Sequence, residues 1–152
     1  MEISEDDVYG MDWDWFASDR DGHVAHFTTA GMRPLPESVR SSREQLEQLS
    51  SYFTDRAPIR GSALLTPGLD RRRGAFNKPV NWSCFLHMAA RGLYSYNTEL
   101  IHSADAEYYL VATPDQPLAL DDLPEGVRYA VRRTVLSISF ATATRIAEAQ
   151  ML

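Results

Sequence analysis

The sequence contains a single cysteine, Cys84, among its 152 residues, so no disulfide can form within the chain. A lone thiol agrees with a reducing compartment. The chain lacks an apolar run of the roughly 18 residues that a membrane-spanning helix needs. Its acidic opening, MEISEDDVYG, has neither the basic start nor the apolar centre of a secretory signal. The expected location is therefore the cytoplasm.

Basic residues are outnumbered, with 15 Lys and Arg against 21 Asp and Glu and a net charge of −6. Residues 1–22 carry eight acids against one arginine, and residues 99–125 carry seven acids and no Lys or Arg. Residues 56–91 reverse the balance, with seven bases against one acid. Acidic surfaces repel phosphate backbones and attract basic proteins, although they also simply keep proteins soluble. We therefore expect a protein partner, with no nucleic acid and no membrane.

Catalytic and metal-binding motifs are missing as well. The chain has no Gly-x-Ser-x-Gly turn and no glycine-rich turn that would hold a phosphate before a helix. The stretch DWDWFASDRDGH suggests a calcium loop, but both alignments put Ala17 where a ligand or the obligatory glycine must stand. Cys84 and His87 offer two zinc ligands at most, because His23 and His26 point to opposite sides of a strand. The sequence predicts no metal, no cofactor and no catalytic residue.

Two alternative functions are retained. A small enzyme would use Cys84 or a histidine as nucleophile or base, which requires a reactive and partly exposed thiol. A regulatory nucleic-acid-binding protein would use Arg71–Arg73, which precede Phe76 and Lys78 in the basic segment. The pI near 5.1 favours a solvated loop for that segment instead.

The residues that are present predict an N-terminal β-hairpin. Asp21-Gly22 lies between the apolar segments 12–18 and 23–29, and this dipeptide is a strong signal for a two-residue turn. Such a turn places Phe16 opposite Phe27. Apolar side chains then lie on both faces of the hairpin.

Periodicity predicts the remaining elements. Apolar residues at helical spacing predict three helices, within 36–56, 82–91 and 121–136. Alternation predicts strands at 93–99, 106–114 and 137–146, with a helix over 143–152 as the alternative at the C-terminal end. We therefore expect one globular α+β domain over residues 1–152. It has a small antiparallel sheet, built from the N-terminal hairpin and C-terminal strands, with about three helices packed mainly on one face. Residues 1–10 should be loosely ordered, and 57–79 should form a long loop with at most a short strand at 62–66.

Acids and large aromatic side chains alternate in the predicted strands. Most rings of this size are buried, but exposed Trp or Tyr rimmed by acids is typical of an interface hot spot. The candidate partner-binding residues are Trp13, Asp14, Trp15, Tyr96, Glu99, Asp105, Glu107 and Tyr108. If the two tryptophans point into the core, the hairpin is scaffold, and if they point outward, it is a docking surface.

Two blocks of the sequence match a pattern of turns and hairpins. The first is DWFASDRDGHVAHFTTAGMRPLPESV, and the second is AARGLYSYNTE followed by YYLVATPDQPLALDDLP. Together they resemble small bacterial immunity proteins encoded beside polymorphic toxins, over most of residues 12–140. Asn97 departs from the pattern, which has an acid there, and the segment RRRGAFNK has no counterpart.

The resemblance implies a non-catalytic immunity protein that binds and neutralises a cognate bacterial toxin domain. An acidic, aromatic-rich surface would cover the active site of the toxin. Opposite charges would speed the association of the two proteins. In that function no residue has to perform chemistry and no cofactor is required.

Overall fold

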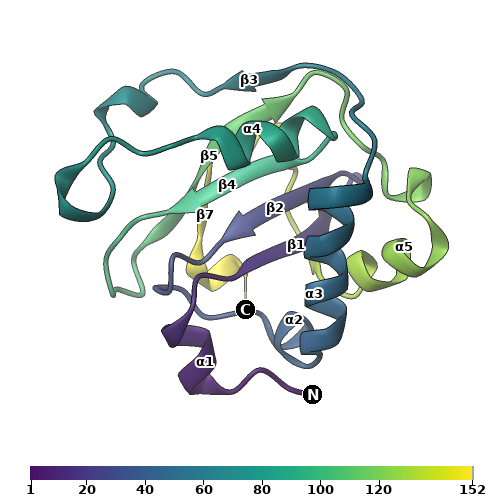
Figure 1. Cartoon of the computed structure of the whole chain (residues 1–152), viewed down its shortest axis with the longest axis horizontal. Helices are drawn as coiled ribbons and strands as arrows, with labels where there is room; N and C mark the ends of the chain where they lie inside the picture. The colour runs from purple at the N-terminus through teal and green to yellow at the C-terminus, as the bar shows by residue number, and fades with distance from the viewer. Residues whose placement is uncertain (152) are drawn as a thin grey trace.

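A mixed β-sheet runs through the computed structural model, which describes residues 1–151 apart from the side chain of Ala75. Its strands are β1 (Asp14–Asp19), β2 (Val24–Thr28), β3 (Ala63–Leu65), β4 (Tyr94–Thr98), β5 (Glu107–Pro114), β6 (Val135–Leu136) and β7 (Arg145–Ala147). The spatial order is β3-β5-β4-β2-β1-β6, and β7 pairs with β5 off this path (Figure 1). The fold is α+β, as the sequence predicted.

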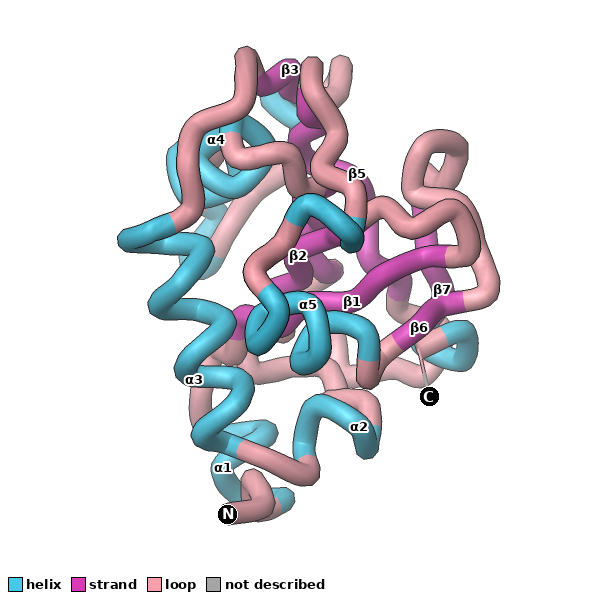
Figure 2. The backbone as a smooth tube through the Cα atoms, turned by 90° about the vertical axis from the view of Figure 1, so that its right-hand side faces the viewer, coloured by secondary structure: helices cyan, strands magenta, loops and turns pink. Residues whose placement is uncertain are grey.

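Helices cover one face of this sheet. The α-helices are α1 (Glu5–Gly10), α2 (Glu37–Arg40), α3 (Arg43–Ser51), α4 (Ser83–Ala90) and α5 (Glu125–Arg132). A π-helical turn at Tyr52–Arg56 extends α3, and 3-10 turns lie at Leu69–Arg71, Ala75–Asn77, Leu120–Asp122 and Glu148–Gln150. In the view of Figure 2, α3 and α4 lie to one side of β1 and β2, and β6 and β7 lie to the other. Among residues 1–151, no helix combines the length and the apolar character needed to cross a membrane.

The sheet is mixed, so the expectation of an antiparallel sheet is wrong. β1 pairs with β2, and β4 with β5, in antiparallel fashion, but β2 pairs in parallel with β4 and β1 in parallel with β6. Parallel neighbours need a long crossover, which the helical segment between β2 and β4 supplies. The structure also has more α-helices than the three predicted, because the short α1 and α2 lack the length that makes a periodicity visible in sequence.

The hairpin turn contains three residues instead of two. Arg20–Gly22 connect the strands, and Gly22 takes the positive φ of 80° that such a loop needs. As a result, Phe16 lies opposite His26 instead of Phe27. A shift of one residue moves every side chain of β2 to the other face relative to β1. The predicted register is therefore wrong.

The N-terminal segment contains α1 and is attached to the core by two apolar side chains. Ile3 and Val8 are buried in the main core. Ser4 caps α1 by accepting a hydrogen bond from the backbone N–H of Asp7 at 3.1 Å. The segment is too short to show a helical repeat, so sequence patterning alone missed it.

The segments 57–79 and 137–146 each contain only a short stretch of strand. The segment 57–79 contains β3, the short strand that the sequence suggested at 62–66, and β3 pairs with β5. The same segment buries Leu69 beneath α4. The predicted strand at 137–146 is wrong, because β6 ends before it at Leu136 and only its last two residues, Arg145 and Ile146, pair as a strand, in β7. Residues 137–144 instead cross the sheet and insert Phe140 into the core.

The two faces of the central strands have different contents. One face, here called the aromatic face, consists of Trp15, Phe27, Tyr96 and Tyr108, whose rings contact one another. Phe140, from residues 137–144, covers it. The opposite helix-covered face carries Phe16, His26 and Ser95 and packs under α3 and α4. The candidate site lies at one edge of this second face.

Candidate functional site

A pocket of about 620 Å³ opens where three strand ends meet the first turn of α4 and residues 71–74. β1 begins at this edge, whereas β2 and β4 end there, since β2 is antiparallel to β1 and parallel to β4. The lining residues include acids, bases and one thiol: Asp12, Asp14, Arg71, Arg72, Arg73, Cys84, Asn97, Glu99 and Tyr109. Strand direction thus assembles residues that are far apart in sequence.

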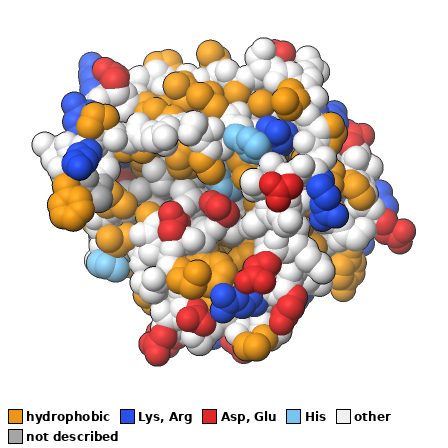
Figure 3. Space-filling model, viewed as in Figure 1, with side chains coloured by type: hydrophobic (Ala, Val, Ile, Leu, Met, Phe, Trp, Pro, Cys, Tyr) orange, Lys and Arg blue, Asp and Glu red, His pale blue; other side chains and the backbone are white. Residues whose placement is uncertain are grey.

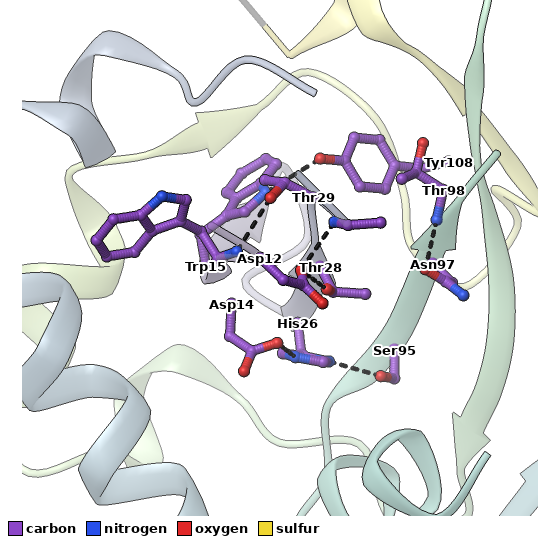
Figure 4. Close-up of polar contacts among 12 residues, drawn as sticks. Asp12, Asp14, Trp15, His26, Thr28, Thr29, Ser95, Asn97, Thr98 and Tyr108 are labelled. Atoms are coloured by element: carbon purple, nitrogen blue, oxygen red, sulfur yellow. Dashed lines mark hydrogen bonds and ion pairs between the residues drawn. The ribbon is translucent and has the colours of Figure 1, made fainter. Parts of the chain in front are cut away.

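Two carboxylates of the pocket, those of Asp12 and Asp14, are each held in place through one oxygen only. One oxygen of Asp12 accepts hydrogen bonds from the Thr28 hydroxyl and, at 2.8 Å, from the backbone N–H of Ala30. One oxygen of Asp14 lies 2.9 Å from Nε2 of His26 (Figure 4). Within residues 1–151, the second oxygen of each carboxylate has no hydrogen-bond or ion-pair partner. Both acids are therefore positioned by the fold and still available to a ligand.

The aspartate belongs to a chain of three polar groups that resembles a catalytic triad. The Ser95 hydroxyl lies 2.7 Å from Nδ1 of His26, whose Nε2 contacts Asp14 (Figure 4). In a serine hydrolase the hydroxyl faces the substrate and the carboxylate is buried. Here Ser95 and His26 are fully buried, whereas the Asp14 side chain is 42% exposed. The order is inverted, so this chain anchors a carboxylate at the pocket and keeps the hydroxyl away from it.

Sequence reasoning did not find this chain. Its three members come from different strands and carry no shared spacing motif, and no Gly-x-Ser-x-Gly turn marks Ser95. The parallel pairing of β2 and β4 places His26 directly beside Ser95. A contact that depends on parallel pairing leaves no local signal in the sequence.

Cys84 is the exposed thiol that the enzyme alternative requires, but its environment deactivates it. Partial burial of the sulfur, followed by the negative charges of Asp14 and Asp12, raises the pKa of Cys84 to about 11. Catalytic cysteines show the opposite shift, because the thiolate is the nucleophile. At neutral pH this thiol is protonated, which counts against a cysteine enzyme.

Arg71–Arg73 form the basic wall of the same pocket. The Arg72 guanidinium lies 3.4 Å from the ring centroid of Tyr109, and Arg73 donates to the backbone oxygen of Asp70 at 2.6 Å. In the described part of the chain, no ion pair within 4.0 Å joins this wall to the acids. A nucleic-acid phosphate would meet those acids too, which counts against the nucleic-acid alternative.

The aromatic members of the predicted partner-binding set are core residues. Trp15, Tyr96 and Tyr108 are at most 1% exposed, and Trp13 is 7% exposed. Their polar atoms also bond inside the protein: the Trp15 indole N–H donates to the Tyr108 hydroxyl at 3.2 Å, and the Tyr96 hydroxyl donates to the backbone oxygen of Ala143 at 2.7 Å. The expectation that these rings form a docking surface is wrong, because residues 137–144 cover the face on which three of them lie.

The acidic members of the predicted set are divided between two places. Asp14 and Glu99 line the pocket. Asp105 and Glu107 lie outside it, in and after the loop between β4 and β5. The guanidinium of Arg145 lies between Glu99 and Glu107, 3.5 Å from the first carboxylate and 3.7 Å from the second. Only two of the four acids therefore share a concave site.

A second cluster of residues that could bind a metal lies at the hairpin turn, which it stabilises. Ligand atoms of Asp19, Asp21 and His23 lie within 4.8 Å of one another. However, the buried Asp19 carboxylate accepts backbone N–H bonds from Asp21 and His23 at 2.9 Å and from Phe140 at 2.7 Å. These bonds fix the turn and attach it to the C-terminal segment. The cluster is therefore explained by structure without a metal.

The chain was compared with known proteins at three levels. Protein-family models, curated proteins and solved structures all give no match. The resemblance to immunity proteins therefore depends only on the two sequence blocks.

Proposed function

We propose that this chain is a non-catalytic, cytoplasmic immunity protein that binds a cognate bacterial toxin domain and covers its active site with an acidic surface. The partner is a protein, and no cofactor takes part. The proposal combines the resemblance of the two sequence blocks with the chemistry of the pocket.

The inverted order of Asp14, His26 and Ser95 is the observation that supports binding over catalysis. It presents an anchored carboxylate to solvent and hides the hydroxyl. The neighbouring thiol of Cys84 has its pKa raised to about 11, so it is a poor nucleophile at neutral pH. Groups at the pocket can attract a basic partner but are badly placed for attack on a substrate.

The pocket acids Asp12, Asp14 and Glu99, here called the acidic rim, replace the buried rings as the proposed contact surface. In Figure 3, acidic side chains are visible below the α4 layer. Exposed apolar side chains lie beside this region in sequence, among them Met11, Leu100 and Ile101. A rim of charge around smaller apolar groups suits fast, electrostatically steered association with a basic domain.

Co-expression with the toxin domain encoded beside this chain tests the proposal. We expect growth to be rescued and the two proteins to co-purify at low salt, with association slowing as salt screens the charges. Absence of both rescue and complex would overturn the proposal.

A charge-matched pair of variants makes the test specific. Glu99→Gln removes a carboxylate from the pocket, and Asp121→Asn removes an exposed carboxylate that does not line it. Weaker capture of the toxin by the first variant but not by the second supports the acidic rim as the contact. Equal capture by both would place the contact elsewhere.

A further inference from the structure

The pocket already contains a guanidinium that belongs to the chain itself. Arg72 lies over the ring of Tyr109, with 3.4 Å between its guanidinium carbon and the ring centroid. The Tyr109 hydroxyl in turn accepts a hydrogen bond from the side-chain amide of Asn97 at 3.1 Å. The ring is therefore held in place, and the structure itself shows that this wall accepts a planar cation.

The carboxylates of the same pocket are not used by that internal guanidinium. No ion pair within 4.0 Å joins Arg72 to Asp12, Asp14 or Glu99 in the described chain. His26 holds Asp14, and Thr28 with Ala30 holds Asp12, so neither acid needs to be reorganised when a cation arrives. The pocket offers an aromatic plane and two fixed acids, and its volume of about 620 Å³ is sufficient for a side chain.

We propose that this pocket receives an arginine side chain presented by the partner protein, which binds to Asp14 and Asp12 and displaces Arg72 from Tyr109. The inference depends on the proposed function only for the identity of the partner. Arginine fits better than lysine, because a planar guanidinium can both bind a carboxylate and stack on a ring. Arg72 then acts as an internal competitor that leaves the pocket when the partner binds.

The isolated chain tests the pocket without any toxin. The probe is the blocked peptide acetyl-Gly-Arg-Gly-amide, titrated at fixed ionic strength while backbone amide signals are followed by NMR. We expect saturable shifts at Cys84, Asn97 and Glu99. The citrulline peptide, which has nearly the same shape but no charge, should produce none, and the lysine peptide should bind more weakly. Equal shifts with the arginine and citrulline peptides would overturn the inference.

Two substitutions should move the affinity for the arginine peptide in opposite directions. Asp14→Asn retains an acceptor for His26 but loses the charge, and it should weaken binding about five- to tenfold. Asp121→Asn is the charge-matched control, and Glu99→Gln provides a second pocket variant if Asp14→Asn folds poorly. Circular dichroism of each variant checks the fold. Unchanged affinity in a folded Asp14→Asn or Glu99→Gln variant would contradict the proposed site.

Arg72→Ala removes the competitor and uncovers the ring, so it should tighten peptide binding about threefold. Arg71→Ala removes the same charge from the same wall without uncovering Tyr109, and it should gain less. A gain in Arg71→Ala equal to that in Arg72→Ala would mean that charge alone matters, which would overturn the proposed displacement.

The outcomes separate this inference from the proposed function. If the toxin binds the wild type and Asp14→Asn equally, and the arginine peptide does not bind, the pocket inference fails while the immunity function stands. If the arginine peptide binds and the toxin does not, the immunity function fails while the pocket stands as an arginine-binding site.

Discussion

The two faces of the central strands are built by alternate residues of the same strands, yet one face is closed and the other is open at an edge. On the aromatic face, rings stack on rings, and Trp15 and Tyr96 satisfy their polar atoms inside the protein. On the helix-covered face, His26 and Ser95 end in an exposed carboxylate at a pocket. Large rings in a strand thus formed core, whereas short polar residues at strand ends formed the candidate site.

The difference follows from what covers each face. Residues 137–144 cross the aromatic face and place Phe140 among its rings. On the other face, α4 has eight residues, which span only about 12 Å at 1.5 Å per residue. The helix begins at the edge where β1 begins and β4 ends, and its first turn lines the pocket there. The segment 69–77 completes the wall there and leaves the pocket open.

Breaking the aromatic face should have the largest effect. Trp15→Ala removes a fully buried ring that stacks on Phe27 at 4.3 Å and donates to Tyr108. We expect a loss of roughly 3–5 kcal/mol in the free energy of unfolding, measured by urea denaturation. The protein that remains folded should bind its partner as the wild type does. Normal stability with lost binding would show that the ring is a contact residue after all.

Releasing the cover of the aromatic face should have the next largest effect. Asp19→Ala leaves three backbone N–H groups, including that of Phe140, without their acceptor. A loss of about 2–3 kcal/mol is expected, together with faster hydrogen exchange at Phe140. Asp21→Ala, at the exposed neighbouring position, is the control. Equal losses in the two variants would contradict the role given to Asp19.

Removing one member of the Asp14–His26–Ser95 chain on the helix-covered face should lower the free energy of unfolding by less. Ser95→Ala leaves Nδ1 of His26 without its partner and should lower the free energy of unfolding by about 1 kcal/mol, measured by the same urea titration. Because the hydroxyl is buried and His26 still contacts Asp14, binding of the partner and of the arginine peptide should change much less than in Asp14→Asn. If Ser95→Ala abolished a hydrolytic activity of the purified chain, the hydroxyl would be a nucleophile and the binding proposal would fail.

The smallest expected effect is a shift in the pKa of Cys84, which reports on the charge of the pocket. Because the pKa of Cys84 is about 11, its alkylation by neutral iodoacetamide should be half-maximal near that pH in the folded protein. In urea the pKa of the thiol should return toward its ordinary value of 9.0. Asp14→Asn removes a negative charge beside the sulfur and should lower the pKa. A fall of one unit raises the thiolate fraction at neutral pH about tenfold. Asp121→Asn should leave the profile unchanged.

Several elements were visible in the sequence because their signals are local. The helical spacing within 36–56 corresponds to α3 with its π-helical extension, where Leu46, Leu49 and Phe53 are buried. The alternating segments 93–99 and 106–114 became β4 and β5. Turn residues placed the hairpin correctly, although its loop is one residue longer than expected. Such patterns depend on neighbours within one helical turn or one strand.

The site itself was only partly visible. Asp14 and Glu99 were among the candidate residues because acids cluster near the predicted strands, and Arg71–Arg73 and Cys84 were named under the alternatives. Nothing in the sequence showed that all of them share one pocket. His26 and Ser95 gave no signal as a pair, since 69 positions separate them and parallel pairing brings them together.

The sequence by itself determined the types of the longer helices and strands, the acidic balance and the lack of a nucleophile motif, since each depends on residue identity and short-range spacing. Only the tertiary structure decided which strands run parallel, which face Trp15 occupies and which end of the Asp14–His26–Ser95 chain meets solvent. Those outcomes depend on contacts between distant segments, above all on residues 137–144 covering one face. A hairpin with apolar side chains on both faces has no preferred outside until the rest of the chain covers it.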